Sequence, residues 1–153
     1  MMTFLRSVWA EGITPLWRRP PAVQVAALCY RLRKDTVECL LITSTEGRWI
    51  LPKGWPEDGL AGHQAALKEA WEEAGVREGL ADATAIGSFR SQKKLGNGVV
   101  VRCRTEVYPV RVLDLAKNYP EVKRRDRRWV VLQDAVQMAT ETGLKEILAS
   151  FAP

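Results

Sequence analysis

The chain has 153 residues, a length that suits one domain with a self-sufficient hydrophobic core. Apolar residues make up 46% and charged residues 27%, which is typical of globular proteins and excludes disordered, collagen-like and coiled-coil chains. The net charge is +5, and no apolar run approaches the roughly 18 residues of a membrane-spanning helix, so we expect no membrane association.

The N-terminal part of the chain predicts an extension followed by strands. Residues 1–21 end in Arg18-Arg19-Pro20-Pro21, where adjacent prolines block regular pairing, so we expect an extension there and a domain over residues 22–153. Strands are predicted over residues 22–32, 37–45 and 48–51, and a Gly- and Pro-containing loop over residues 53–60.

One helix and then further strands follow. Good helix formers over residues 61–74 end at Gly75, a typical C-terminal glycine. Two strands, 83–94 and 99–113, flank the hairpin signal Gly96-Asn97-Gly98. A short strand over residues 129–132 precedes helices over 133–139 and 143–151. Strands on both sides of one central helix predict an α/β (α+β) sandwich.

The three cysteines indicate a reducing compartment. Cys29, Cys39 and Cys103 form no CxxC pair and have apolar neighbours, which argues against a disulfide framework and a zinc site. We therefore expect buried free thiols. Residues 1–10 are too short and too interrupted for a signal peptide, so we expect a cytoplasmic protein.

The charges divide the chain into an acidic and a basic stretch. Residues 54–78 hold six acids and two bases, whereas residues 88–130 hold twelve lysines and arginines and four acids. This distribution predicts a polyanionic ligand with room for a cation between the two stretches. A basic patch also suits nucleic acid, but no nucleic-acid-binding motif is present, so we expect a small molecule instead.

The acidic stretch is centred on the predicted helix. At 100° per residue, Glu69, Glu72 and Glu73 fall within an arc of roughly 100°. Like charges at these spacings destabilise a helix, and the helix dipole adds to that cost in the last turn. A divalent cation such as Mg²⁺ or Mn²⁺ reverses both effects. The alternative is a solvated acidic face neutralised by Lys68 and Arg77.

Read from Gly54, this segment resembles the Nudix box, G-x5-E-x7-R-E-U-x-E-E-x-G-U, in which U is aliphatic. Gly54, Glu69, Glu72 and Glu73 match its glycine and its three central glutamates, and Gly75-Val76 matches its end. The resemblance implies a Nudix-type α/β/α sandwich with a mixed β-sheet.

Two residues depart from the box. Leu60 stands where the family has its first Glu, and Lys68 stands where the family has its Arg. In the family these two positions shape the loop and orient the helix. We expect Lys68 to lack a partner at position 60 and Leu60 to bury its side chain beneath the loop. Because the metal-binding glutamates are retained, we expect the reaction class to be retained.

The resemblance extends beyond the box. Arg48-Trp49-Ile50-Leu51-Pro52-Lys53-Gly54, Tyr119-Pro120-Glu121, Arg124-Arg125 and Arg128-Trp129 look like the branch that hydrolyses diadenosine polyphosphates and diphosphoinositol polyphosphates. The branch implies attack by water on phosphorus, with divalent metal ions bridging the diphosphate oxygens.

The resemblance also implies roles for individual residues. Glu72 and Glu73 are the expected metal ligands, Glu69 a ligand or the base that orients water, and a main-chain carbonyl at Lys53 or Gly54 a further ligand. Glu121 and Glu106 are rival candidates for an extra acid from a later segment, and the alternative for each is a plain surface acid.

Basic residues are the expected phosphate contacts, although any one of them alone could equally be a solvated charge. The candidates are Lys53, Arg90, Lys93, Lys94, Arg102 and Arg125. Trp71 is expected in the core.

Together these features predict a Mg²⁺- or Mn²⁺-dependent pyrophosphohydrolase, monomeric or homodimeric, that acts on a phosphorylated small molecule such as a diadenosine or diphosphoinositol polyphosphate. One alternative is a nucleoside triphosphate or RNA 5′-end pyrophosphohydrolase. The other is a catalytically weak regulatory module that binds a nucleotide.

Overall fold

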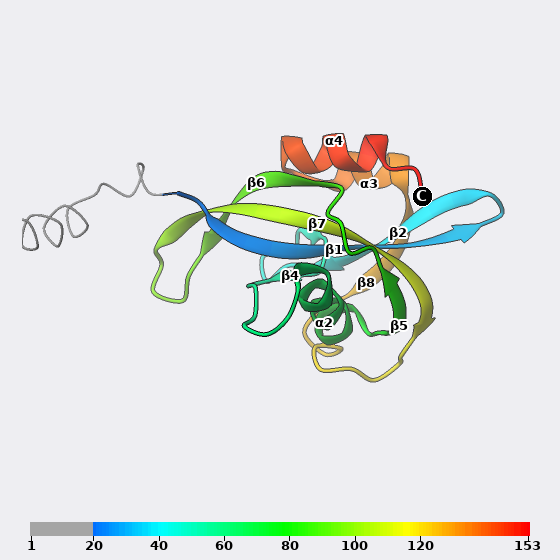
Figure 1. Ribbon diagram of the computed structural model, residues 1–153, viewed down its shortest axis with the longest axis horizontal. Helices are drawn as coiled ribbons and strands as arrows, with labels where there is room; N and C mark the ends of the chain where they lie inside the picture. The colour runs from blue at the N-terminus through cyan, green and yellow to red at the C-terminus, as the bar shows by residue number, and fades with distance from the viewer. Residues whose placement is uncertain (1–19) are drawn as a thin grey trace, which may run out of the picture.

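A computed structural model describes residues 20–153 of the chain, coloured in Figure 1. The predicted extension, residues 1–21, lies outside the described residues except for its last two. No helix in the described part is long and apolar enough to cross a membrane.

Within residues 20–153, eight strands form one mixed sheet whose main path runs β3-β2-β1-β7-β5. The remaining strands extend it: β4 pairs with β1, β6 with β7 and β8 with β2. β1 runs parallel to β7 and antiparallel to β2 and β4. The strands are β1 (Ala22–Arg33), β2 (Thr36–Thr43), β3 (Trp49–Ile50), β4 (Lys53–Gly54), β5 (Val76–Ala81), β6 (Gly87–Lys94), β7 (Val100–Leu115) and β8 (Arg127–Val131).

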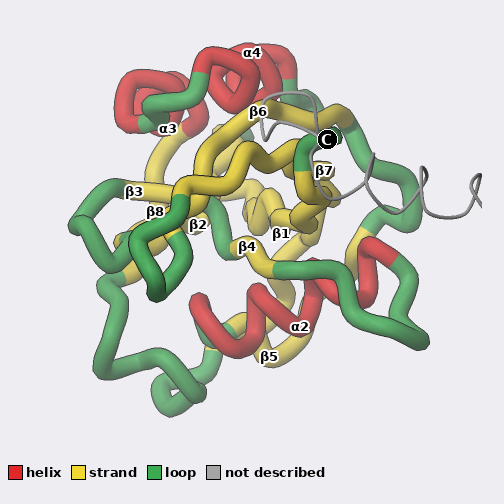
Figure 2. Tube along the Cα trace, turned by 90° about the vertical axis from the view of Figure 1, so that its left-hand side faces the viewer, coloured by secondary structure: helices red, strands yellow, loops and turns green. Residues whose placement is uncertain are grey.

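Helices cover both faces of this sheet. Helix α2 (Gly62–Ala74) lies on one face, and α3 (Leu132–Met138) and α4 (Thr142–Ser150) lie together on the other, as Figures 1 and 2 show. The predicted α/β/α sandwich with a mixed sheet is therefore confirmed.

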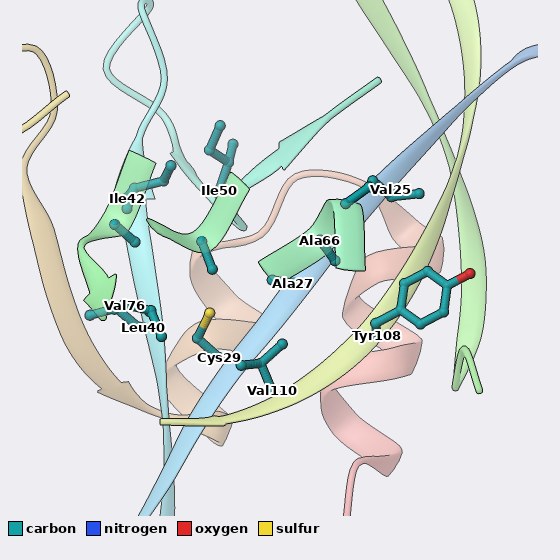
Figure 3. Packing of buried hydrophobic residues seen from close by; sticks show 13 residues of the cluster. Val25, Ala27, Cys29, Leu40, Ile42, Ile50, Ala66, Val76, Tyr108 and Val110 are labelled. Carbon is teal, nitrogen blue, oxygen red and sulfur yellow. The ribbon is translucent and has the colours of Figure 1, made fainter. Parts of the chain in front are cut away.

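Strand β1 contributes to both hydrophobic cores because its side chains alternate between the two faces. Val25, Ala27 and Cys29 belong to the core under α2, seen in Figure 3, whereas Ala26 and Leu28 belong to the core under α3 and α4. Burial on both sides explains why this segment is almost continuously apolar.

Three predicted features are confirmed in detail. Gly75 ends α2 with φ +71°, the left-handed conformation that a C-terminal glycine adopts without strain. The three cysteines are free and buried. The hairpin between β6 and β7 also turns at Gly96–Gly98 as expected, and Gly98 has φ +84°.

Two strands were not predicted. β4 (Lys53–Gly54) lies where we expected only loop, because its two residues pair with the middle of β1 without any apolar pattern of their own. β5 (Val76–Ala81) is an edge strand with three exposed residues out of six, and it pairs with the end of β7 across two register shifts. β5 is short, contains charged residues and follows a helix directly, so its sequence carries no clear strand pattern.

The sheet-facing side of α2 consists of alanines and one glutamate rather than of Trp71. Ala66, Ala70 and Ala74 are completely buried, Glu73 is 4% exposed, and Trp71 is only half-buried and outside the core clusters. The prediction that Trp71 belongs to the core is therefore wrong. Small side chains let α2 approach the sheet closely, so the indole has no room beneath the helix.

Leu60 also differs from its prediction, because its side chain is 38% exposed rather than buried beneath the loop. A tight turn holds it at the surface: the Leu60 N–H donates to the Glu57 carbonyl at 3.1 Å, and Gly59 between them has φ +83°. Lys68 is not without a partner either. Its Nζ lies 2.7 Å from Glu57 Oε2, so Glu57 supplies the acid that position 60 lacks.

Candidate functional site

The segment from β4 to α2 places the acidic helix against the sheet. β4 pairs with β1 at Val25↔Gly54, which fixes the main chain of Gly54, and Gly54 lies against Glu69 in the second half of α2. A Cβ at Gly54 would overlap the Glu69 carboxylate, so only glycine lets Glu69 lie there. The backbone of β4 and the side chain of Glu69 are therefore in direct contact, as the box resemblance requires.

Glu73 is the most buried of the three helical glutamates. Its Oε2 accepts a hydrogen bond from the Lys53 N–H at 2.9 Å, and its Oε1 lies 3.2 Å from the Arg125 guanidinium. The carboxylate thus joins α2, β4 and the segment before β8. The Lys53 N–H and the Arg125 guanidinium offset the cost of burying the Glu73 carboxylate.

The loop between β7 and β8 brings a fourth carboxylate to this place. The Glu121 N–H donates to the Glu72 carbonyl at 2.9 Å, which anchors the loop on the last turns of α2. Arg125 then links the two acids: its Nε lies 3.1 Å from Glu121 Oε1, and its Nη1 donates to the Thr43 carbonyl at 2.9 Å. Of the two rival extra acids, Glu121 is the one that the structure places beside the box.

The site raises the pKa of two of its carboxylates, Glu69 and Glu73. Burial raises the pKa of Glu69 to about 7, and the charges of Glu72 and Glu121 add to that rise. Burial also raises the pKa of Glu73 to about 7, although the Arg125 charge and the Lys53 N–H oppose it. Charge repulsion and burial both disfavour the ionised form of these carboxylates, and a bound divalent cation would offset that cost.

The donor set fits a hard divalent cation chemically, because it consists of carboxylate and carbonyl oxygens. Among residues 20–153, however, no group of three acidic, histidine or cysteine side chains is already arranged to hold a metal ion. Glu73 is turned toward Lys53 and Arg125 instead. A cation would therefore compete with Arg125 for Glu73.

A cleft of about 900 Å³ opens beside Glu73. It is bounded by the β2–β3 loop, the β6–β7 hairpin and the α3–α4 loop. Four of the predicted phosphate contacts line it: Lys53, Lys93, Lys94 and Arg125. Burial lowers the pKa of the Lys53 ammonium, which lies inside the cleft.

Several residues of the cleft, Arg48 and Glu141 among them, were not among the predicted site residues. Arg48 lies 3.2 Å from Thr140 Oγ1 and 3.8 Å from Glu141 Oε1, so it ties the β2–β3 loop to the α3–α4 loop. Arg48 could have been found, because it opens the stretch that leads into the box. Glu141 could not, since nothing local marks an acid 68 positions after Glu73 as a neighbour of the site.

Three other predicted site residues lie away from the cleft. Arg90 and Arg102 are exposed on strands β6 and β7, and Arg90 pairs in register with Arg104 beside a separate hollow of about 550 Å³. Glu106 accepts a hydrogen bond from the Tyr108 hydroxyl at 3.1 Å and pairs with Arg104 at 3.4 Å.

Arg127, one of the twelve lysines and arginines between positions 88 and 130, has a structural role. Its Nη1 and Nη2 each donate at 2.8 Å, to the carbonyls of Ala74 and Ala116, and its guanidinium lies 4.8 Å from the Tyr119 ring centroid. It therefore satisfies the C-terminal end of α2 and fixes the start of the loop that carries Glu121.

The family model for the NUDIX domain matches residues 22–151. The chain belongs to the Nudix family. Nudix hydrolases generally use divalent metal ions, which agrees with the oxygen donor set described above. The match covers nearly all of the described residues, from β1 to the end of α4.

Curated relatives carry hydrolase names. Nudix hydrolase 16 of Arabidopsis thaliana is 31% identical over 114 residues, 73% of this chain and 63% of the relative. Diphosphoinositol polyphosphate phosphohydrolase 2 of Mus musculus is 29% identical over 119 residues, 75% of this chain and 61% of the relative. The chain thus spans about three-fifths of the length of these relatives.

Solved structures share the Nudix fold at low sequence identity. The Ap4A hydrolase of C. elegans has a TM-score of 0.58 and 19% identity, and the match covers 85% of this chain and 95% of that one. The NUDIX domain of Shewanella oneidensis NrtR, complexed with ADP ribose, has a TM-score of 0.57 and 16% identity, over 94% and 95% of the two chains.

Proposed function

We propose that this Nudix domain is a Mg²⁺-dependent pyrophosphohydrolase that cleaves a diphosphate linkage in a polyphosphorylated small molecule. A diadenosine polyphosphate or a diphosphoinositol polyphosphate is the leading substrate class, in keeping with the names of the relatives. The three buried free thiols suit a reducing compartment, and the proposal places the protein in the cytoplasm as a monomer or homodimer.

The observation that carries the proposal is the meeting of a basic cleft with a carboxylate cluster at Glu73. The cleft offers Arg48, Lys53, Lys93 and Lys94 to phosphate oxygens, while Glu69, Glu72 and Glu121 lie beyond Glu73. The basic side chains of the cleft would therefore balance the charge of a bound polyphosphate, and the carboxylate cluster at Glu73 would lie next to it as the hydrolytic centre.

The chain's own residues have distinct tasks in this scheme. A bound divalent cation would neutralise the diphosphate and lower the pKa of attacking water. Glu72 and Glu73 would hold the cation, and Glu69, held against Gly54, would hold it or take the proton from water. Arg125 positions Glu73 and Glu121, and the Lys53 N–H fixes the second oxygen of Glu73.

The test is phosphate release from a panel of substrates with Mg²⁺, with Mn²⁺ and with EDTA. The panel contains diadenosine tetraphosphate, a diphosphoinositol polyphosphate, ATP and 5′-triphosphorylated RNA, so it includes the alternative substrates. Activity is expected only with metal, and Glu73→Gln should lose most of it. Glu78→Gln, an exposed acid on β5, is the matched control and should retain it.

Full turnover in EDTA would contradict the metal-dependent mechanism. Absence of hydrolysis across the panel, together with nucleotide binding, would instead favour a regulatory module. One structural neighbour, the NrtR of Shewanella oneidensis, was solved in complex with a 27mer DNA, and its NUDIX domain in complex with ADP ribose.

A further inference from the structure

Glu141 brings a negative charge into a cleft whose lysines and arginines otherwise suit phosphate. It lines the cleft from the α3–α4 loop, and its side chain is only 14% exposed. Its Oε1 lies 3.8 Å from Arg48 Nη1, which is an ion pair but is too long for a hydrogen bond. Because burying a carboxylate is costly unless it is closely paired, this loose pairing indicates a role other than stability.

The side chain of Glu141 does not hold its own helix. Glu141 is the N-cap residue of α4, but the cap has no side-chain hydrogen bond. The first bond of the helix uses main chain only, since the Lys145 N–H donates to the Glu141 carbonyl at 3.0 Å. The carboxylate therefore serves the cleft rather than α4, and replacing it should leave the helix intact.

Glu141 acts on two of the basic side chains that a phosphate would use. It pairs with Arg48, whose Nη1 also lies 3.2 Å from Thr140 Oγ1. Burial lowers the pKa of the Lys53 ammonium, and the Glu141 charge is the largest effect that opposes this fall. One carboxylate thus offsets positive charge on both Arg48 and Lys53.

The β6–β7 hairpin presents its basic side chains differently. Lys93 and Lys94 line the cleft, and within residues 20–153 neither of them forms an ion pair. Lys93 Nζ lies 5.0 Å from the Trp55 ring centroid instead. Burial raises the pKa of Glu69, and the Lys93 charge is among the effects that oppose this rise, so the hairpin leads toward the carboxylate cluster. Positive charge is therefore available along the hairpin and partly neutralised at the loops.

This asymmetry favours a linear chain of phosphates over a ring that carries phosphates on all sides. A linear polyphosphate is narrow, so it can follow Lys94 and Lys93 toward Glu73 without approaching Glu141. An inositol ring places phosphates in every direction, so some of them meet Glu141 when its diphosphate lies at Glu73. Like charges brought together in a partly buried cleft repel strongly.

We infer that Glu141 is a specificity-determining residue that disfavours phosphorylated inositol rings and selects a linear polyphosphate, such as that of a diadenosine polyphosphate. The inference rests on the proposed function and narrows its substrate class. Glu141 acts by repulsion: it adds no contact to the favoured substrate, and it weakens the binding of the competing one.

The test compares a ring with a linear chain in binding. Calorimetric titrations with Mg²⁺ use inositol hexakisphosphate and a methylene-bridged analogue of tripolyphosphate, neither of which contains a hydrolysable phosphoanhydride. Glu141→Gln should bind the ring at least about tenfold more tightly and the linear analogue within about threefold of the unmodified protein, because several ring phosphates meet the removed charge. Glu146→Gln, an exposed acid on α4, is the matched control and should change neither affinity.

A second variant separates the charge of Glu141 from the anchoring of Arg48. Thr140→Val removes the 3.2 Å contact of Arg48 without changing any charge, so the ratio of the two affinities should stay within about twofold. A shift as large as that of Glu141→Gln would show that the anchoring of Arg48 sets the selectivity, and would overturn the inference. Equal gains for both ligands in Glu141→Gln, or no gain, would do the same. If Glu141→Gln does not fold, Glu141→Ser, with a favourable N-cap residue, decides in its place.

Hydrolysis separates the inference from the proposed function. The ratio of kcat/KM for diadenosine tetraphosphate to that for a diphosphoinositol polyphosphate should exceed one and should fall in Glu141→Gln, through KM of the inositol substrate. The expected shift in binding, found in a protein that hydrolyses neither substrate, would overturn the proposed function and leave the role of Glu141 standing. Hydrolysis with the same ratio in both proteins would overturn the role of Glu141 alone.

Discussion

Gly54 decides where the Glu69 carboxylate lies, because the Cβ of any other residue would occupy that position. The end of the Glu69 side chain can move, whereas the main chain of Gly54 is paired with β1. We therefore expect Gly54→Ala to displace Glu69 and leave the fold intact. Its kcat should fall about as far as that of Glu69→Gln, with little change in melting temperature. Gly87→Ala, where φ is not positive and a Cβ would meet the Ile147 side chain at 3.4 Å, is the control, and a large loss of stability in Gly54→Ala would refute this explanation.

The ionisation of Glu69 and Glu73 makes the stability of the metal-free protein depend on pH. Both pKa values are raised from 4.5 to about 7 in the folded state, so the folded protein holds more protons than the unfolded chain between these values. The free energy of unfolding should therefore fall as pH rises through that window and level off above it.

Thermal melts in EDTA between pH 5 and 8 measure this effect, and Mg²⁺ at pH 8 should restore much of the lost stability. Glu73→Gln should flatten the dependence, whereas Glu78→Gln should not. A metal-free protein whose stability rises over this range would show that the two carboxylates gain more from Arg125 than they lose by burial.

At the scale of elements, the C-terminal end of α2 joins the helix to the loop that carries Glu121. Gly75 has φ +71°, and a Cβ there would overlap the Tyr119 ring and come within 2.6 Å of Arg127 Nη1. The Ala116 N–H also donates to the Gly75 carbonyl at 2.8 Å. The end of the helix therefore positions the loop, and the loop positions Glu121 and Arg125.

Gly75→Ala should destabilise the protein more than Gly59→Ala. Both glycines have positive φ, so each alanine costs about 1–2 kcal/mol of backbone strain. Only Gly75→Ala also displaces Tyr119 and Arg127, since a Cβ at Gly59 meets open space. Denaturant unfolding curves measure the two losses, and equal values would mean that the Tyr119–Arg127 packing yields without cost.

The elements that sequence patterns predicted are those with a strong local signal. The helix ending at Gly75, the β6–β7 hairpin and the apolar β1 each carry their own signal in composition or turn chemistry. β4 and β5 exist only because β1 and β7 offer them partners, and such pairing is not visible in a two-residue or polar segment.

The same distinction holds for the site. Glu69, Glu72 and Glu73 were found because one helix carries them at fixed spacing. Glu141 and the Arg125 contacts were not, because they depend on loops that meet only in three dimensions. For Trp71 and Leu60, the apolar side chain alone predicted burial, and this prediction was wrong. The close packing of α2 on the sheet leaves no room for the Trp71 indole, and a tight turn holds Leu60 at the surface.

At the scale of the whole molecule, several basic side chains meet at one cleft. Arg48, Lys53, Lys93 and Lys94 line it, while the β1–β2 turn with Lys34 lies at the opposite end of the sheet from the β6–β7 hairpin (Figure 1). Substrates with more phosphates should therefore gain more from the cleft.

We expect kcat/KM to be higher for diadenosine tetraphosphate than for ADP-ribose, and the ratio to shrink between about 50 and 500 mM salt as screening increases. Lys94→Gln should reduce the ratio, and Lys34→Gln should leave it unchanged. A higher kcat/KM for ADP-ribose would remove this chain from the polyphosphate branch.

The parallel pairing of β1 with β7 has a consequence for how the chain is made. Partners such as Ala22 and Cys103 are roughly eighty positions apart, so the central ladder of the sheet closes only after a long stretch of chain has been synthesised. Until then β1, apolar on both faces, has one unpaired edge on the ribosome, where it can pair with another nascent chain. Slow synthesis or truncation before residue 115 should therefore favour aggregation over a partly folded domain, and this protein should depend on chaperones more than its small size suggests.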